Sequence, residues 1–251
     1  MEHLVVVAVV HLPLRSMGTS ITASPSPLPT LDFENDLWRS GYSHVAGVDE
    51  VGLGCLAGPI VAAAVLMPRD IVPIVGIRDS KKLSELQRNR LCGQIQQQAI
   101  AIGIGMASVA EIEEINVLQA SYRAMHRAIG RIQSLDHALI DGRKIKVDFG
   151  IPITTIIKGD SLSYSIACAS IVAKVRRDRF MTRLASRYPG YGWENNRGYG
   201  TAQHLSGLRS LGVTSWHRKT YSPVRTVIEQ LSLFPQSFPL AIALDRSNAQ
   251  A

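Results

Sequence analysis

Residues 44–67 read HVAGVDEVGLGCLAGPIVAAAVLM, in which two apolar segments flank a turn rich in glycine. The first segment, 44–49, is typical of a short strand that ends at a carboxylate. The second, 60–67, is apolar throughout, as expected of a strand that is buried on both faces. Two adjacent acids, Asp49 and Glu50, therefore fall at the end of the first strand, where burying either without a partner would cost free energy. This pair is the first candidate functional site.

Beyond this stretch, the apolar residues alternate between strand and helix periodicity. Ser84 with Gln87, and Ser108 with Glu111, have the spacing of capping boxes, which mark helix starts. Together the segments predict an α/β domain with a mixed five-stranded sheet flanked by helices. The remaining predicted elements are strands at 100–107, 138–141 and 153–157, and helices at 83–98, 116–133 and 164–187.

The composition excludes several classes of protein. Of 251 residues, 46% are hydrophobic and 19% are charged, which excludes a wholly disordered chain. No apolar run approaches about 18 residues, so no membrane-spanning helix is predicted. The 3 cysteines form no CxxC pair, which argues against a disulfide framework or a zinc ribbon and fits a reducing compartment. We expect a disordered extension over 1–40, one folded domain over 41–225 and a C-terminal tail over 226–251.

The positive charge is concentrated in one part of the chain. The formal net charge is +7, and residues 138–225 alone carry 15 Lys or Arg against 5 Asp or Glu. This excess makes polyanions plausible partners, although a solvated basic face would have the same composition. Much of it falls on the helix expected at 164–187, whose basic residues are Lys174, Arg176, Arg177, Arg179, Arg183 and Arg187.

Carboxylates follow three of the predicted strands. Asp49 and Glu50 end one strand, Asp141 ends another, and Asp160 lies between a strand and the basic helix. Acids at strand ends can converge on one crevice, and two unit charges 4 Å apart repel by about 4 kcal/mol at an effective dielectric of 20. Such a cluster must hold protons or a cation, and ligands that are all oxygen favour Mg²⁺ or Mn²⁺ over zinc. Taken singly, Asp141 could belong to an Asp-Gly turn and Asp160 could interact with a helix dipole.

Several motifs occur in a fixed order along the chain. They are 46–52 (AGVDEVG) with Gly54 and 57–59 (AGP), 79–83 (DSKKL), 116–126, 139–142 (LIDG), 157–161 (IKGDS), 169–178 (ASIVAKVRRD), and 198–201 (GYGT) with His204. From about residue 42 to residue 225, their order and spacing resemble those of ribonuclease HII. The related ribonuclease HIII class is disfavoured, because the first forty residues are too short and too rich in Pro and Ser for the N-terminal domain usual in that class.

The resemblance implies an RNase H-like fold with a helical C-terminal part. It also implies a cytoplasmic, monomeric endoribonuclease that acts on RNA/DNA hybrids or on duplex DNA with embedded ribonucleotides. Such an enzyme cuts on the 5′ side of the ribonucleotide with two Mg²⁺ or Mn²⁺ ions, and so serves DNA replication and repair. By motif, Asp49, Glu50 and Asp141 would be metal ligands, and Asp160 the fourth catalytic acid, serving the second ion.

The same resemblance implies a set of substrate-binding residues. The backbone of the glycine turn would recognise the ribose 2′-hydroxyl, which distinguishes RNA from DNA. Tyr199 would stack on the sugar of the following deoxynucleotide, and basic side chains would face phosphates. The full set is Gly52, Leu53, Gly54, Lys158, Lys174, Arg177 and Tyr199.

The sequence departs from the family pattern near the acids. The family turn usually reads Gly-Arg-Gly-Pro, whereas this chain has Leu53 and Cys55 in place of the arginine and the proline. Arg143 replaces the asparagine that usually follows Asp-Gly. Both turn glycines remain, so backbone recognition is expected to persist. An alternative reading, based on Leu53 and Arg143, is a nucleic-acid-binding homologue with weakened catalysis.

Overall fold

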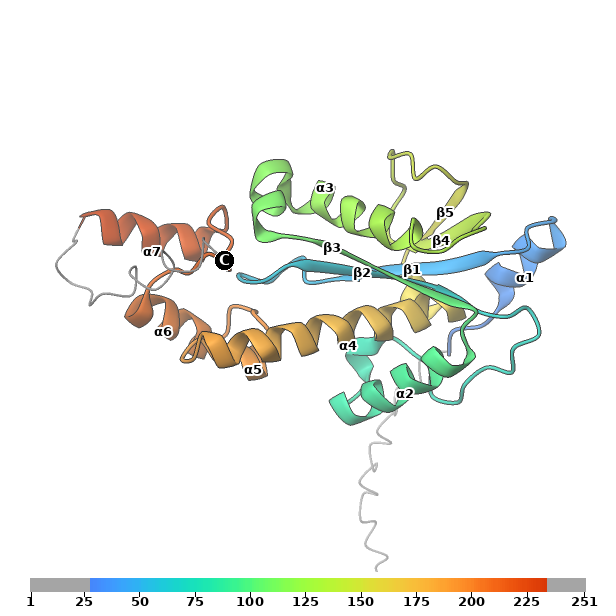
Figure 1. Ribbon diagram of the computed structural model, residues 1–251, viewed down its shortest axis with the longest axis horizontal. Coiled ribbons are helices and arrows are strands. Elements are labelled where there is room, and N and C mark those ends of the chain that lie inside the picture. The colour runs from blue at the N-terminus through green and yellow to red at the C-terminus, as the bar shows by residue number, and fades with distance from the viewer. Residues whose placement is uncertain (1–27, 234–251) are drawn as a thin grey trace, which may run out of the picture.

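The computed structural model of the protein describes residues 28–233 (Figure 1). The strands are β1 (Val45–Val51), β2 (Ile60–Leu66), β3 (Ala101–Ala107), β4 (His137–Asp141) and β5 (Ile153–Ile156). The helices are α1 (Asp32–Arg39), α2 (Glu85–Gln98), α3 (Val109–Ile129), α4 (Tyr164–Arg187), α5 (Trp193–Asn196), α6 (Ala202–Leu211) and α7 (Ser222–Leu233), with short 3₁₀ turns η1 (Ser80–Lys82) and η2 (Gly159–Ser161).

The five strands form one sheet in the order β3-β2-β1-β4-β5. The β1–β2 and β2–β3 pairs are antiparallel, whereas β1–β4 and β4–β5 are parallel. Helix α3 covers one face of the sheet and α4 the other; α5 lies against the far end of α4, and α6 and α7 extend beyond it (Figure 1). The predicted mixed five-stranded sheet, flanking helices and helical C-terminal part are confirmed.

Strand β2 shows why the centre of the sheet is apolar on both sides. All seven of its residues are buried. Ala62 and Ala64 pack in the core on the α3 side, while Ala63 and Val65 pack on the α4 side. A strand enclosed in this way needs an unbroken apolar sequence, as 60–67 indicated.

Both predicted capping boxes are formed. Ser84 starts α2 with Gln87, and Ser108 starts α3 with Glu111. Helix α3 therefore begins earlier than the predicted start at Asn116. That residue has non-helical backbone angles (φ 67°, ψ 164°), and its side-chain oxygen accepts hydrogen bonds from the next turn of the helix. The predicted helix start at Asn116 is therefore a kink within α3, where the Asn116 side chain caps the turn that follows.

Helices extend beyond both boundaries of the domain predicted over residues 41–225. Helix α1 lies within the segment assigned to a disordered extension, and it buries Trp38 and Glu34. One oxygen of Glu34 accepts hydrogen bonds from Ser163 and Ser165 at the start of α4, at 2.6–2.8 Å. Helix α7 likewise runs past residue 225.

Residues 1–27 of the expected extension and 234–251 of the expected tail lie outside the described residues. Within 28–233, no helix is both long and apolar enough to cross a membrane.

Candidate metal centre and substrate-binding surface

The parallel pairing of β1 and β4 brings two of the predicted acids to one edge of the sheet. Val48 stands opposite Ile140, and the residues that follow them are Asp49 and Asp141. Asp49 is only 5% exposed, and Asp141 is half-buried. The Gly159 N–H donates to Asp141 Oδ1 at 2.7 Å, which fixes this carboxylate against the turn that carries Asp160.

Asp160 joins these two acids from η2, the short turn that leads into α4. Asp49, Asp141 and Asp160 each offer a carboxylate oxygen, and these oxygens all lie within 4.8 Å of one another. Asp160 is 6% exposed, so two of the three acids are buried. The sequence prediction that three separate segments converge on one site therefore agrees with the geometry.

Glu50 lies beside this group without being part of it. It follows Asp49 on β1, and its N–H donates to Asp49 Oδ1 at 2.7 Å. Within the described residues, its Oε2 is buried and has no hydrogen-bond partner. Burial and the nearby charge of Asp141 raise the pKa of Glu50 to about 7.

Asp49 and Asp141 are also destabilised as anions. Burial raises the pKa of Asp49 well above its ordinary value, and the charges of Glu50 and Asp141 add to the rise. Burial and the charge of Asp160 raise the pKa of Asp141 as well. Because desolvation and like charge act together here, the cluster favours proton uptake unless a cation is present.

Two polar residues that the sequence reasoning left without a role complete the cluster. Lys81 Nζ lies 3.5 Å from Asp160 Oδ2, and Asp79 positions this lysine by accepting its backbone N–H at 2.9 Å. Partial burial lowers the pKa of Lys81, but the charges of Asp160 and Asp49 outweigh it, so the pKa is raised. Ser170 on α4 opposes the pKa rise of Asp49 by hydrogen bonding. Both residues lie in the quoted motifs 79–83 and 169–178, which could have identified them.

This donor set fits a hard divalent cation. Among residues 28–233, Lys81 pairs with Asp160, the buried Oε2 of Glu50 has no hydrogen-bond partner, and three carboxylates present oxygens to a common point. Ligands that are all oxygen are those that Mg²⁺ and Mn²⁺ prefer. A bound divalent ion would also offset the burial and like charge that raise the pKa values of Asp49, Glu50 and Asp141.

The glycine turn follows the acids directly. Gly52 has φ +105°, a conformation that side chains rarely adopt, and a Cβ there would collide with Arg177. The Arg177 side chain is fully buried, and it donates to the carbonyl oxygens of Ala57 and Pro59 at 3.0 Å and of Arg197 at 2.8 Å. The expectation that Arg177 faces a phosphate is therefore wrong, because its guanidinium is buried and hydrogen-bonded to backbone carbonyls around the turn.

A second buried arginine holds the other side of this turn. Arg218 donates twice to the Gly58 carbonyl, at 2.9 and 3.1 Å, and once to the Leu53 carbonyl at 2.9 Å. Tyr221 also donates to the Leu53 carbonyl, at 2.6 Å. The Leu53 side chain and Gly54 are exposed, and nothing lies within 4 Å of a Cβ at Gly54. The turn is anchored by its carbonyls and leaves its outer edge open. The sequence alone does not predict a role for Arg218 or Tyr221, because isolated residues of these types belong to no motif.

Tyr199 and Lys174 lie together, as the substrate assignment requires. Tyr199 is 40% exposed, and Lys174 Nζ lies 5.8 Å from the centre of its ring. Lys174 also pairs with Asp178 at 2.8 Å, so it is not a free cation. Lys158 is exposed in a left-handed turn just before Asp160, and Arg143 is exposed just after Asp141.

A buried histidine pair supports the Tyr199 backbone. Trp193 donates to His204 Nε2 at 3.0 Å, so His204 carries its proton on Nδ1, which donates to the Tyr199 carbonyl at 2.9 Å. Thr214 N–H donates to His217 Nδ1 at 3.0 Å, and His217 Nε2 lies 3.1 Å from His204 Nε2, whose single lone pair already accepts the Trp193 N–H. Burial lowers the pKa of both histidines, to about 3 for His217, so both rings are neutral at pH 7.

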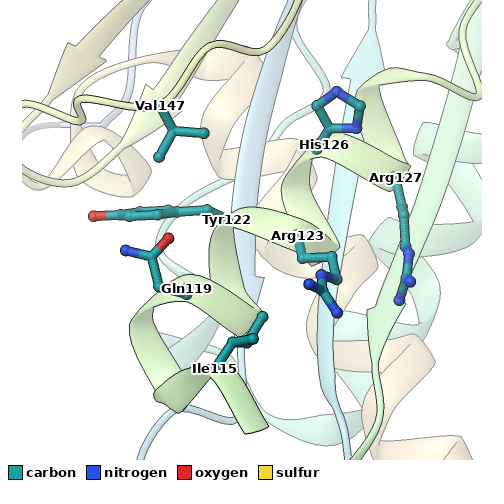
Figure 2. Close-up of a pocket in the computed structure, with 7 residues that line it drawn as sticks. All are labelled: Ile115, Gln119, Tyr122, Arg123, His126, Arg127 and Val147. Atoms are coloured by element: carbon teal, nitrogen blue, oxygen red, sulfur yellow. The ribbon is translucent and has the colours of Figure 1, made fainter. Parts of the chain in front are cut away.

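A separate hollow of about 450 Å³ lies between α3 and the segment that joins β4 to β5. In Figure 2 the Tyr122 ring lies between Val147 and Gln119, with Arg123 and Arg127 on the adjacent side. Glu111 pairs with Arg123 at 3.1 Å and with Arg127 at 2.7 Å, so both arginines share one acidic partner. The described lining of this hollow includes none of the predicted site residues.

Comparison with known proteins agrees with this arrangement. Residues 46–224 match the family model of ribonuclease HII. The ribonuclease HII of Thermosynechococcus vestitus is 62% identical over 192 residues, covering 76% of this chain and 90% of that protein. The ribonuclease HII of Bacillus anthracis is 48% identical over 199 residues, covering 79% and 76%. The solved ribonuclease H2 of Pyrococcus horikoshii OT3 shares the fold, with a TM-score of 0.63 at 24% identity over 75% of this chain and 99% of that chain. The chain therefore belongs to the ribonuclease HII family.

Proposed function

We propose that this protein is an endoribonuclease that hydrolyses the phosphodiester on the 5′ side of a ribonucleotide. Its substrates would be RNA/DNA hybrids and duplex DNA with embedded ribonucleotides, and its role the removal of misincorporated ribonucleotides. The observation that supports this best is the meeting of Asp49, Asp141 and Asp160 oxygens within 4.8 Å, beside an anchored glycine turn, in a member of the ribonuclease HII family.

The acids would serve as ligands for two Mg²⁺ or Mn²⁺ ions. Asp49, Glu50 and Asp141 would be the main ligands, and Asp160 would serve the second ion. Paired ions of this kind supply a nucleophilic water at neutral pH and stabilise the leaving oxygen in an in-line displacement. The protein's own contribution is to hold the four carboxylates close together, with Lys81 compensating Asp160.

The glycine turn would select the ribonucleotide. Arg218 and Tyr221 hold the Leu53 carbonyl, and Leu53 and Gly54 are exposed. The backbone of Gly52, Leu53 and Gly54 would recognise the ribose 2′-hydroxyl, with the buried Gly52 at the base of the turn. These bonds go to the backbone carbonyl of Leu53, whose side chain is exposed. Replacement of the usual arginine by leucine therefore removes one cation while keeping the recognition element, and the reading as a weakened homologue is not favoured.

The remaining surface would position the strand. Tyr199 would stack on the sugar of the deoxynucleotide that follows the ribonucleotide, and Lys158 and Lys174 would lie near phosphates. Contacts of this kind fix register without reading sequence. We further propose a monomer that works in the cytoplasm, a location consistent with the free thiols of Cys55, Cys92 and Cys168.

A cleavage assay with three duplexes tests the proposal. One is all DNA, one carries a single ribonucleotide, and one is an RNA/DNA hybrid. The purified protein with Mn²⁺ or Mg²⁺ should leave the first intact, cut the second at one bond on the 5′ side of the ribonucleotide, and cut the third at many bonds. Equal cutting of the all-DNA duplex, or no cutting of the other two, would refute the proposal.

A further inference from the structure

Asp178 is a buried acid on α4 to which the proposed chemistry gives no role. Its side chain is 9% exposed and is surrounded by cations from α2, α4 and the segment after α5. Its Oδ1 accepts a hydrogen bond from Lys174 Nζ at 2.8 Å. Its Oδ2 lies 3.9 Å from a nitrogen of Arg88 and 4.0 Å from a nitrogen of Arg197. A buried carboxylate depends on such partners, because an uncompensated charge in the interior is costly.

The two arginines hold one side of this carboxylate. The side chains of Arg88 and Arg197 are only 14% and 12% exposed. Arg88 also donates to the Ser80 carbonyl at 3.1 Å, and Arg197 pairs with Glu85 at 3.0 Å. Because both arginines are fixed by these further contacts, they fix Asp178 Oδ2 in turn, and Oδ1 is directed at the lysine.

Lys174 connects this acid with Tyr199. Its Nζ lies 5.8 Å from the centre of the Tyr199 ring, a distance at which a cation is attracted to the face of an aromatic ring. A lysine has a long, flexible stem, so its ammonium stays at one place only when a partner holds it. Asp178, four residues further along α4, is that partner, and the other two N–H donors of the ammonium are left for a phosphate.

The Tyr199 ring lies at the edge of the glycine turn. The Leu56 N–H donates to the Gly198 carbonyl at 2.8 Å, which joins the two segments. Burial and the neighbouring Cys55 raise the pKa of the Tyr199 hydroxyl, in agreement with this placement. The ring is 40% exposed, so the side chains that touch it determine how it is presented to a ligand. Lys174 is such a side chain.

We propose that Asp178 is a positioning residue for substrate recognition. It holds the Lys174 ammonium against the Tyr199 ring, and thereby fixes the ring for the sugar of the deoxynucleotide that follows the ribonucleotide. The inference rests on the proposed function, because the sugar contact follows from the Tyr199 assignment. The competing role of Asp178 is structural: compensation of the two arginines in the folded protein, without an effect on Tyr199.

The test compares Asp178→Asn and Lys174→Met, each in the parent and in a Tyr199→Ala background, together with the double variant of the first two. Asparagine keeps a neutral acceptor of the same size, and methionine keeps most of the length of lysine. The matched control is Glu111→Gln, which removes the acid shared by two arginines at the hollow in Figure 2. Thermal unfolding shows whether each variant folds as the parent does.

Cleavage kinetics in Mn²⁺ measure the effect on recognition. On a duplex with one ribonucleotide, Asp178→Asn should lose about fivefold in kcat/KM, mainly through KM, as expected for a loosened cation–aromatic contact. The loss should be smaller on an RNA/DNA hybrid, in which another ribonucleotide follows. In the Lys174→Met and Tyr199→Ala backgrounds, Asp178→Asn should have little further effect. The control variant should cleave both duplexes as the parent does.

A measurement without substrate separates this inference from the proposed function. The protein is labelled with ¹³C in its tyrosine rings, and the Tyr199 signal is identified by its loss in Tyr199→Phe. Asp178→Asn and Lys174→Met should both shift that signal, because each changes the charge at the face of the ring. Glu111→Gln should leave it in place.

Two results would overturn the inference: a Tyr199 signal that Asp178→Asn leaves in place, or a loss of kcat/KM from Asp178→Asn that is the same with and without Tyr199. If Asp178→Asn does not fold, an unshifted Tyr199 signal in Lys174→Met overturns it equally. Absence of cleavage of every ribonucleotide-containing duplex by the parent would instead refute the proposed function, and the Tyr199 signal would still decide whether Asp178 positions the ring.

Discussion

The Arg218 guanidinium donates a hydrogen bond of 2.9 Å to the carbonyl oxygen of Leu53, a residue 165 positions earlier in the chain. The same oxygen accepts the Tyr221 hydroxyl at 2.6 Å. Both donors come from the C-terminal part, so that part of the chain sets the orientation of the glycine turn beside the acids. This relationship connects a structural element far along the sequence with recognition of the ribose.

Removing one of these donors should loosen the turn without unfolding the protein. In Tyr221→Phe the Leu53 carbonyl keeps Arg218, so we expect the free energy of unfolding to fall by about 1 kcal/mol. The value of kcat/KM on a single-ribonucleotide duplex should fall by about fivefold or less, since about 1 kcal/mol is at stake. Denaturant unfolding and steady-state kinetics measure the two effects. Unchanged kinetics would show that the turn does not depend on this bond.

His204 should act through Tyr199. His204→Leu removes the donor to the Tyr199 carbonyl, whereas His204→Asn can retain a donor near the same position. We expect the leucine variant to lose roughly fivefold in kcat/KM for each hydrogen bond of about 1 kcal/mol that is lost, mostly through KM, and the asparagine variant to recover part of it.

A double-mutant cycle separates this positioning role from general destabilisation. In a Tyr199→Ala background, exchanging His204 for leucine should have little further effect on kcat/KM. Equal losses in the two backgrounds would mean that His204 contributes only to folding.

The buried histidine pair should make stability depend on pH. The pKa of His217 is about 3 in the folded protein, against 6.5 ordinarily, so the unfolded chain binds a proton that the folded chain rejects. The neutral His217 ring therefore makes its full contribution to the free energy of unfolding above pH 6.5. This contribution is lost as the pH falls from 6.5 toward 3, at about 1.4 kcal/mol per pH unit. His217→Gln should have a shallower decline over this window in urea unfolding at a series of pH values. Parallel curves for parent and variant would contradict the neutral, buried assignment.

Helix α1 should be part of the folding unit. Glu34 receives three hydrogen bonds from the start of α4, so Glu34→Ala should lower the free energy of unfolding by about 3 kcal/mol. A fragment of residues 28–233 should be markedly more stable than one of residues 41–233. Thermal unfolding compares the two fragments, with the full chain as the reference. Equal stability would show that α1 is dispensable.

The sequence predicts the central elements well because their signals are local. The apolar run of β2 and the capping boxes of α2 and α3 are formed by residues close in sequence. The predicted span of α4 agrees with Tyr164–Arg187. Gly105 has low strand propensity, but glycine is required at this position of β3 because a Cβ would collide with the α3 backbone at Ala124. Local propensity yields here to packing between a strand and a helix.

The parts that escape prediction depend on contacts between distant segments. No motif in residues 32–39 predicts that Glu34 will accept hydrogen bonds from the start of α4. The resemblance places Arg177 among the cations that face phosphates, although it lies seven residues after Ser170 and four before Met181, which puts all three on the inner face of the helix. Helical spacing could have separated Arg177 from its exposed neighbours, but its three carbonyl partners come from elsewhere in the chain.

The central claim is that Asp49, Asp141 and Asp160 together hold the divalent ions on which cleavage depends. Titration of Mn²⁺ into the purified protein, followed by electron paramagnetic resonance and by cleavage of a single-ribonucleotide duplex, tests it most directly. The parent should bind Mn²⁺ and cut the duplex over the same concentration range, while Asp49→Asn and Asp141→Asn should bind it far more weakly and cut at most at a trace of the parent rate. If either variant bound Mn²⁺ and cleaved the duplex as the parent does, the three acids would not be the metal centre.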